Sequence, residues 1–86
     1  MLTLYTKDNC PYCDGAKAIL NSMQEEYVEI DINEDGVRDW LKERGHKTVP
    51  QIYWNEQLLV EGGYTGLSKI TVTELQEKKR AIIEAN

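Results

Sequence analysis

Cys10 and Cys13 are the residues of this chain whose types and spacing most directly indicate chemistry. They are its two cysteines, and only Pro11 and Tyr12 lie between them. A disulfide at this spacing closes a very small loop, so it removes little entropy from the unfolded chain and would stabilise the fold poorly. A Cys-x-x-Cys pair is instead typical of a metal site or of a dithiol that exchanges electrons.

A zinc site is the first alternative. Structural zinc takes four ligands, which usually come as two pairs. The chain has no second Cys-x-x-Cys, and its one histidine, His46, is expected in a loop without a catalytic role. A single chain therefore lacks the ligands, and no metal site is expected. A cluster that two chains share through their cysteines remains open.

The predicted local structure favours a reactive dithiol. Residues 2–6 (LTLYT) have the apolar and β-branched composition of a strand. Asp8 or Asn9 can cap a helix that follows, and Pro11 suits an early helical position, where its missing N–H is harmless. Cys10 would therefore lie at a helix N-terminus, whose unpaired N–H groups and partial positive charge stabilise a thiolate.

This placement predicts different roles for the two thiols. The pKa of Cys10 should fall below the ordinary value of about 8.5, and the positive charge of Lys7 would add to this effect. Cys13 lies one helical turn later on the same side, more deeply buried and within reach of a disulfide formed at Cys10. We therefore expect Cys10 to be the exposed nucleophile and Cys13 the resolving thiol.

The rest of the chain alternates between strand-like and helix-like stretches. Further strands are expected at residues 27–32, 50–54 and 57–61, with helices after residues 33 and 63. In the second strand, Val28, Ile30 and Ile32 form the apolar side that should be buried. Asn33 is the expected cap of the next helix, and residues 55–56 are the expected tight turn of a hairpin.

The last helix and the order of elements complete the predicted fold. Residues 71–74 (TVTE) resemble a capping box, and Leu75, Ile82 and Ile83 should supply the buried side of the helix that follows. The order β-α-β-α-β-β-α over residues 1–86 predicts a single α/β domain. Its four-stranded mixed sheet would be flanked by helices.

The charge balance and the first residues argue against several classes of function. The chain carries 15 acidic and 10 basic side chains, so nucleic acid or an anionic membrane surface is not expected as its main partner. No apolar run approaches the ~20 residues that span a bilayer. The N-terminal stretch lacks the basic and then apolar pattern of a secretory signal. We therefore expect a cytoplasmic location, where thiols stay reduced.

Three motifs together resemble the dithiol glutaredoxin family. They are Cys10-Pro11-Tyr12-Cys13, Thr48-Val49-Pro50 and the glycine-rich turn at 62–66 (GGYTG), in the order and spacing of that family. The resemblance covers essentially the whole chain and implies a thioredoxin-like fold. It also implies a monomeric, glutathione-dependent thiol–disulfide oxidoreductase, with glutathione as a co-substrate and no tightly bound cofactor.

The resemblance implies a glutathione site beside Cys10. The Val49–Pro50 peptide bond would be cis, which would aim the backbone N–H and C=O of Val49 at the cysteinyl part of glutathione. Thr48 would line the same loop, and Tyr12 would flank the mixed disulfide.

The two ends of glutathione would be held by other residues. Lys7 and Lys47 match family positions that often hold a base, and they would meet the glycyl carboxylate. Gly63, Tyr64 and Thr65 would line the γ-glutamyl end, where backbone N–H groups would receive its carboxylate.

Gly66 departs from the family pattern, which commonly has Asp there to meet the amino group of the ligand. This departure leaves a second hypothesis, a glutaredoxin-like electron donor that thioredoxin reductase reduces and that binds glutathione poorly. A third is an iron–sulfur cluster carrier in which two chains and two glutathiones hold one cluster through Cys10. For the first hypothesis, the substrates would be disulfide-containing or glutathionylated proteins, and ribonucleotide reductase is a common target in the family.

Overall fold

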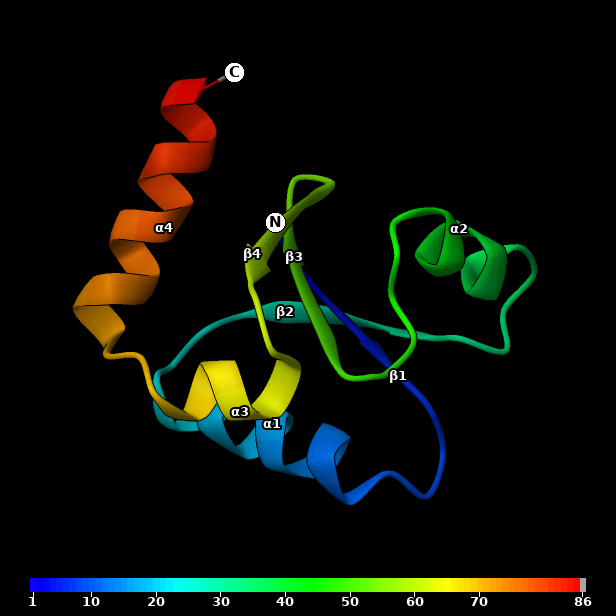
Figure 1. The fold of residues 1–86 in the computed structure, drawn as a ribbon. Coiled ribbons are helices and arrows are strands. Elements are labelled where there is room, and N and C mark those ends of the chain that lie inside the picture. Colours follow the sequence, from blue (N-terminus) through cyan, green and yellow to red (C-terminus); the bar gives the residue numbers. More distant parts are fainter. Residues whose placement is uncertain (86) are drawn as a thin grey trace.

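A computed structural model describes residues 1–85, which contain one four-stranded sheet. The strands are β1 (Leu2–Thr6), β2 (Tyr27–Asp31), β3 (Gln51–Trp54) and β4 (Gln57–Val60). They lie in the order β2-β1-β3-β4 (Figure 1). β1 runs parallel to β2 and antiparallel to β3, and β3 is antiparallel to β4, so the predicted mixed sheet is confirmed.

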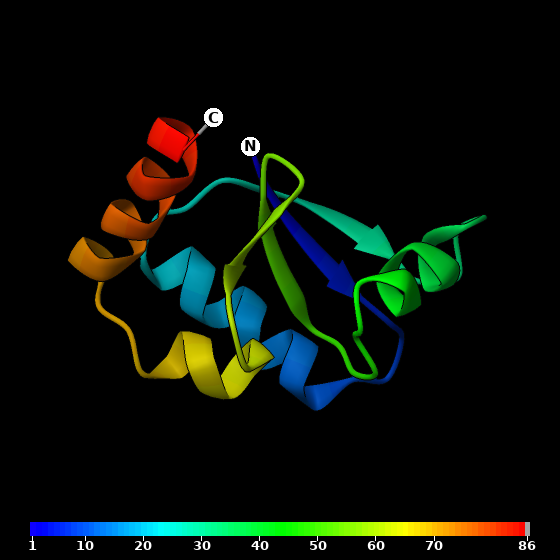
Figure 2. The same cartoon turned by 45° about the horizontal axis from the view of Figure 1, so that its top comes forward.

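The helices lie on both faces of this sheet and along one edge. They are α1 (Pro11–Ser22), α2 (Val37–Glu43), α3 (Gly63–Ser68) and α4 (Val72–Ala85). α1 and α3 lie side by side on one face, α2 lies on the other side, and α4 runs past β4 (Figures 1 and 2). None of the helices within residues 1–85 is long and apolar enough to cross a membrane.

Alternation along β1 explains why the two faces differ. Leu2, Leu4 and Thr6 are buried on the face that α1 covers, because alternate side chains of a strand point the same way. Together with side chains of α1, α3, α4 and the hairpin they form the core: Leu2, Leu4, Ala16, Leu20, Ile52, Leu59, Val60, Leu67 and Leu75.

The opposite face carries a separate aromatic cluster. The ring of Tyr5 lies 5.2 Å from that of Trp40 on α2 and 5.6 Å from that of Tyr53 on β3. The Arg44 guanidinium lies 3.5 Å from the centre of the Trp40 ring. Aromatic stacking therefore attaches the short helix α2 to the sheet.

The predicted burial of β2 is partly wrong. Ile32 is buried, but Val28 is 43 % exposed and Ile30 is only half-buried. β2 is an edge strand, and the seven-residue helix α2 covers little of its outer face. Glu29, expected on the solvent side, instead faces α1 and pairs with Lys17.

The predicted caps of α1 and α2 are also wrong. α1 is capped by Cys10 itself and not by Asp8 or Asn9. α2 begins after Gly36, whose φ of +79° makes the left-handed turn that enters the helix. The side chain of Asn33 instead accepts a hydrogen bond from Arg38.

The C-terminal predictions are mostly confirmed. The Thr71 hydroxyl accepts a hydrogen bond from the Glu74 N–H at 3.1 Å, and the Glu74 carboxylate accepts one from the Thr71 N–H at 3.3 Å. This is the expected capping box. Leu75 is fully buried, but Ile83 is 56 % exposed, and the polar Lys79 occupies a buried position of α4 that the pattern did not predict. The hairpin strands start or end one residue from the predicted bounds.

Candidate active site

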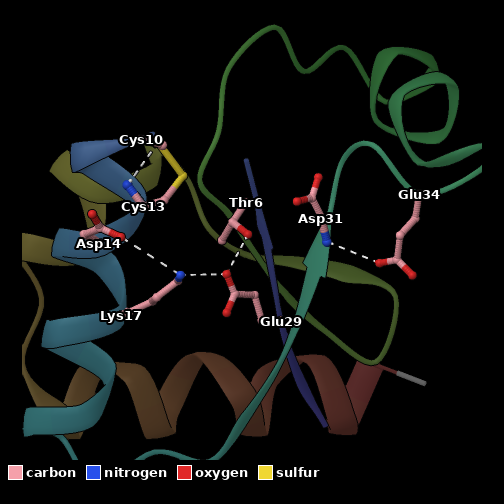
Figure 3. A network of polar contacts seen from close by, with 8 residues as sticks. All are labelled: Thr6, Cys10, Cys13, Asp14, Lys17, Glu29, Asp31 and Glu34. Carbon is pink, nitrogen blue, oxygen red and sulfur yellow. Dashed lines mark hydrogen bonds and ion pairs between the residues drawn. A yellow bond between two sulfur atoms is a disulfide. The ribbon is translucent and has the colours of Figure 1, made fainter. Parts of the chain in front are cut away.

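The two cysteines form a disulfide at the N-terminus of α1 (Figure 3). Their Cα atoms are 5.2 Å apart. Cys10 is the N-cap residue, and its sulfur accepts a hydrogen bond from the Cys13 N–H at 3.1 Å. When the pair is reduced, this N–H and the helix dipole would stabilise a thiolate on Cys10, which is the form of the thiol that attacks disulfides.

Cys10 is more buried than predicted, whereas Cys13 is buried as expected. Cys10 is 5 % exposed and Cys13 is 1 % exposed, so the expectation of an openly exposed nucleophile is wrong for the oxidised pair. Between them, Tyr12 is 64 % exposed. Cys10 keeps the larger exposed fraction of the two, and the division of roles between them stays a prediction.

A polar network holds α1 onto the sheet just beyond the cysteines (Figure 3). Lys17, one helical turn after Cys13, forms an ion pair of 2.6 Å with Glu29 on β2. The hydroxyl of Thr6 donates a second hydrogen bond to the same carboxylate at 2.8 Å. The Lys17 ammonium, and next the Thr6 hydroxyl, hold the pKa of the Glu29 carboxyl below its usual value. Sequence reasoning missed this network because the alternation of β2 placed Glu29 in solvent.

The loop before β3 shares a cavity with Tyr12, the residue that follows Pro11 between the two cysteines. Its Val49–Pro50 peptide bond is cis, as the family resemblance implied. The side-chain amide of Gln51 donates a hydrogen bond to the Thr48 carbonyl at 2.8 Å and so fixes the preceding turn.

A cavity of about 300 Å³ joins this loop to the start of α3. It is lined by Tyr12, Thr48, Val49, Pro50, Gly62, Gly63, Tyr64 and Thr65. Seven of these eight are residues that the sequence analysis assigned to glutathione, with Gly62 as the addition. The structure therefore brings the predicted residues of two distant motifs together around one cavity.

Steric contacts require glycine at two positions of the turn at 62–66. Gly63 has a φ of +55°, and a Cβ there would lie 2.8 Å from the carbonyl oxygen of Pro50. A Cβ on Gly66 would collide with the carbonyl oxygen of Glu61. This backbone therefore leaves no room for the aspartate that the resembling family commonly has at Gly66.

Tyr64 is positioned by a contact that the sequence did not reveal. Gly15 on α1 faces its ring, and a Cβ on Gly15 would lie 2.5 Å from a ring carbon. The rings of Tyr64 and Tyr12 have centres 5.8 Å apart. Because Gly15 has no side chain, α3 can pack close to α1 there, and the Tyr64 ring lies at the cavity.

A second cavity, of about 230 Å³, adjoins the first and shares Thr48 and Val49 with it. Lys7 and Lys47, predicted to meet a carboxylate, both line this second cavity. Arg38 and Lys42 of α2 line it as well, although nothing in the sequence except their charge marks them as site residues. We call this cavity, with Lys7, Arg38, Lys42 and Lys47, the basic cavity.

His46 lies in the loop that borders the basic cavity. A ring nitrogen of His46 is 2.6 Å from the Tyr53 hydroxyl, so the residue ties the loop to β3. Burial, and next the neighbouring Arg44 guanidinium, hold the pKa of His46 below its usual value. The ring is therefore neutral at neutral pH.

Potential metal ligands do not gather within residues 1–85. No group of three or more His, Cys, Asp or Glu side chains could hold an ion in that part of the chain. Cys10 and Cys13 could provide at most two of the four ligands that zinc takes.

Comparison with known proteins agrees with the fold and the dithiol. A family model described as glutaredoxin matches residues 2–59. Glutaredoxin 3 of Escherichia coli (strain K12) is 39 % identical over 56 residues, which cover 63 % of this chain and 68 % of that protein.

Two solved structures share the fold at low sequence identity. A buckwheat glutaredoxin–glutathione complex has a TM-score of 0.70 and 21 % identity, covering 93 % of this chain and 76 % of that one. The glutaredoxin-like protein NrdH-redoxin from Escherichia coli, described as having a thioredoxin-like activity profile, has a TM-score of 0.66 and 14 % identity. That match covers 81 % of this chain and 93 % of the other. The predicted thioredoxin-like architecture is confirmed.

Proposed function

Because the chain belongs to the glutaredoxin family of thiol–disulfide oxidoreductases, we propose that it is a glutathione-dependent enzyme. Its substrates would be protein disulfides and mixed disulfides of proteins with glutathione. One observation supports this proposal above the others: Tyr12, between the two cysteines of the disulfide, lines a cavity together with both the Thr48–Pro50 loop and the Gly62–Thr65 turn. A cavity of this size and length offers room for a short peptide next to the attacking sulfur.

With a protein disulfide, the reaction uses both cysteines. The Cys10 thiolate attacks one substrate sulfur, the substrate S–S bond breaks, and the second substrate sulfur leaves and takes up a proton. Cys13 loses its proton and attacks the Cys10 sulfur of the mixed disulfide, which releases the other substrate sulfur as a thiol. The substrate gains two electrons and the enzyme is left with the Cys10–Cys13 disulfide.

With a glutathionylated protein, Cys10 alone is sufficient. Its thiolate attacks the sulfur of glutathione and releases the protein thiol. A second glutathione thiolate then attacks the mixed disulfide on Cys10, which regenerates the enzyme thiol and forms glutathione disulfide. Two glutathiones reduce the Cys10–Cys13 disulfide in the same manner.

We propose a specific orientation for glutathione across the two cavities. The backbone N–H and C=O of Val49 would pair with its cysteinyl part beside Cys10, and the exposed ring of Tyr12 would cover the mixed disulfide. The glycyl carboxylate would then point toward Lys7 and Lys47.

The opposite end of glutathione would lie on the turn before α3. Backbone N–H groups of Gly63, Tyr64 and Thr65 would receive the γ-glutamyl carboxylate. The adjoining cavities offer places for both ends of the tripeptide, with the reactive sulfur between them.

Turnover of a small glutathione mixed disulfide, with electrons supplied by two separate routes, tests the proposal. The first route uses NADPH, glutathione reductase and glutathione, and the second uses NADPH with thioredoxin reductase alone. We expect turnover by the first route and little by the second. Turnover only by the second would contradict the glutathione-dependent function while leaving the dithiol chemistry intact.

Gly66 favours a second candidate, an electron donor that thioredoxin reductase reduces. The turn has no space for a carboxylate at this position, so a contact to the amino group of glutathione is missing. The fold is shared by a glutathione complex and by a protein with a thioredoxin-like activity profile, so the fold does not choose between the candidates. The same two-route experiment decides between them.

A further inference from the structure

The basic cavity contains more positive charge than glutathione needs. Lys7, Arg38, Lys42 and Lys47 line it, yet the glycyl end of glutathione brings a single carboxylate. None of these four forms an ion pair with any residue in the range 1–85, and Arg38 donates a hydrogen bond to the neutral Asn33 amide oxygen. Four like charges left unpaired around one cavity repel one another, so their grouping indicates an anionic ligand.

The distribution of acidic residues around the basic cavity supports an anionic ligand. The chain has a formal net charge of −5, so cations are in the minority. One acidic group, Glu34, Asp35 and Asp39, lines a separate depression that shares only Ile32 and Arg38 with the basic cavity. Glu61 lines another depression, which shares His46, Lys47 and Thr48 with it. No acidic side chain within residues 1–85 lines the basic cavity itself, so the local sign of charge there is opposite to that of the whole chain.

A protein substrate must pass this cavity in a defined direction. During dithiol reduction the substrate cysteine itself is bonded to Cys10, and its flanking chain takes the place that glutathione would occupy along Val49. The glycine of glutathione follows its cysteine, so the residues that follow a substrate cysteine would run the same way, toward the basic cavity. An extended chain advances about 3.3 Å per residue, so the first two or three residues after the cysteine fall within reach.

We propose that the basic cavity selects protein disulfides in which acidic residues follow the attacked cysteine. The inference rests on the proposed orientation of glutathione, and it concerns the dithiol reaction alone. In the glutathionylated reaction the protein is the leaving group and does not occupy the groove. Arg38 and Lys42 are the residues that this inference adds, because Lys7 and Lys47 are already assigned to the glycyl carboxylate.

A single-turnover experiment with symmetric peptide disulfides tests the proposal. The reduced protein is mixed with the disulfide dimer of Ala-Cys-Glu-Glu, of Ala-Cys-Gln-Gln or of Glu-Glu-Cys-Ala, and the release of peptide thiol is followed. Each peptide disulfide gains two electrons and two protons from Cys10 and Cys13, which end as the protein disulfide. Each rate constant is divided by that of the same peptide with dithiothreitol, which removes the intrinsic reactivity of the peptide.

We expect the normalised rate for Cys-Glu-Glu to exceed that for Cys-Gln-Gln by about fivefold at low salt, as for a few partly exposed ion pairs. The ratio should fall toward about two in 0.5 M salt, where the Debye length is a few Å. Glutamates that precede the cysteine should give no advantage. The net charge of −5 would slow the reaction with both acidic peptides equally. A higher rate for the peptide whose glutamates follow the cysteine would therefore come from the basic cavity and not from the overall charge.

Paired variants separate the cavity from the general effect of charge. The double variant Arg38→Gln/Lys42→Gln should reduce the ratio of the normalised rate constants for Cys-Glu-Glu and Cys-Gln-Gln to about two or below. A general loss of reactivity lowers both rate constants equally and does not change this ratio. The matched double variant Lys69→Gln/Lys78→Gln removes the same charge from exposed positions outside the cavity and should keep the full ratio.

The outcomes distinguish this inference from the proposed function. A ratio near one in the wild type, with the neutral peptide still reduced, overturns the inference alone. Equal loss of the ratio in both double variants also overturns it. Reduction of every peptide without turnover through glutathione would instead contradict the glutathione-dependent function.

Discussion

Two groups of charged side chains, on opposite sides of the sheet, are built in different ways. Beside α4, the Lys79 ammonium pairs with Glu25, and both side chains are only about 10 % exposed. The same ammonium lies 4.8 Å from the centre of the Trp54 ring, and Gln76 donates a second hydrogen bond to Glu25. In the basic cavity beside α2, four exposed cations are left without an ion pair within residues 1–85.

The comparison distinguishes two roles for charged side chains: the Lys79–Glu25 pair stabilises the fold, whereas the cations of the basic cavity are available to a ligand. A buried charge without a partner would be strongly destabilising, so Lys79 and Glu25 must satisfy each other. The cations of the basic cavity are solvated and need no partner for the chain to fold. Substitutions near α4 should therefore change stability, and substitutions near the dithiol should change activity.

The largest effect on activity is expected at the dithiol. Cys10→Ser removes the attacking sulfur and should abolish turnover of every disulfide. Cys13→Ser should keep turnover of glutathione mixed disulfides but lose the reduction of protein disulfides, because no second thiol resolves the intermediate. Assays with both substrate types measure the split, and turnover retained in Cys10→Ser would refute the assignment.

The largest effect on stability is expected at Lys79. Lys79→Met leaves the Glu25 carboxylate buried without its partner and should lower the free energy of unfolding by about 3 kcal/mol. For a domain of this size, the melting temperature should fall by more than about 10 °C. The rate of thiol exchange per folded molecule should not change.

A double variant serves as the control for this prediction. Glu25→Gln/Lys79→Met removes both charges and should recover much of the lost stability, because no unpaired charge stays buried. If the single variant is as stable as the wild type, the pair does not hold α4 and the comparison fails.

Gly63→Ala should affect both properties. At a φ of +55° a side chain costs about 1 kcal/mol, and its Cβ would push against the Pro50 carbonyl oxygen that borders the cavity. We expect the KM for glutathione to rise about tenfold, since the loop and the turn must move apart.

Gly36→Ala is the matched control for Gly63→Ala. Gly36 has a φ of +79°, but a Cβ there would meet no atom within 4 Å. It should show a similar loss of stability with an unchanged KM. An equal rise of KM in both variants would show that backbone strain, and not the contact with Pro50, is responsible.

Single substitutions of the two cavity lysines should have smaller effects. Lys7→Gln and Lys47→Gln should each raise the KM for glutathione roughly threefold, as expected for a partly exposed ion pair. The free energy of unfolding should stay within about 0.5 kcal/mol of the wild type. Steady-state kinetics at two salt concentrations measure the first effect, and Lys69→Gln provides a surface control.

The smallest effect is expected at Glu29. Its folded-state pKa is lowered by Lys17 and then by Thr6, so its contribution to stability is present above the ordinary carboxyl pKa and is lost as the pH falls through the lower folded value. The Glu29 side chain is 42 % exposed, so solvent weakens the effect. Urea unfolding of the wild type and Glu29→Gln should show a small difference at pH 7 that disappears in acid.

The fold and the dithiol were predictable because their signals are local. Alternating strand-like and helical stretches, the capping box at Thr71 and the position of Cys10 beside Pro11 all depend on residues close together in the chain. The cis bond before Pro50 and the residues of the first cavity followed from the family resemblance, although their role in binding glutathione is still a prediction. The cytoplasmic location and the monomeric state are also still predictions.

The missed features depend on contacts between distant segments. The sequence analysis made no prediction for Arg38 and Lys42, because they line the basic cavity only together with residues of the loop before β3. The pairing of Lys79 with Glu25 spans 54 residues, and no periodic pattern indicates it. The burial of Val28 was predicted wrongly because alternation shows that a strand has two faces but not which of them a neighbour covers.

The close approach of Gly15 to Tyr64 has a consequence for how this sequence can change over time. The two positions lie on different helices, yet they act as a single unit of substitution, because any side chain at 15 displaces the ring at 64. A larger residue at position 15 would require a shift of the Tyr64 ring or a smaller residue at position 64, and either change would alter the aromatic wall of the cavity.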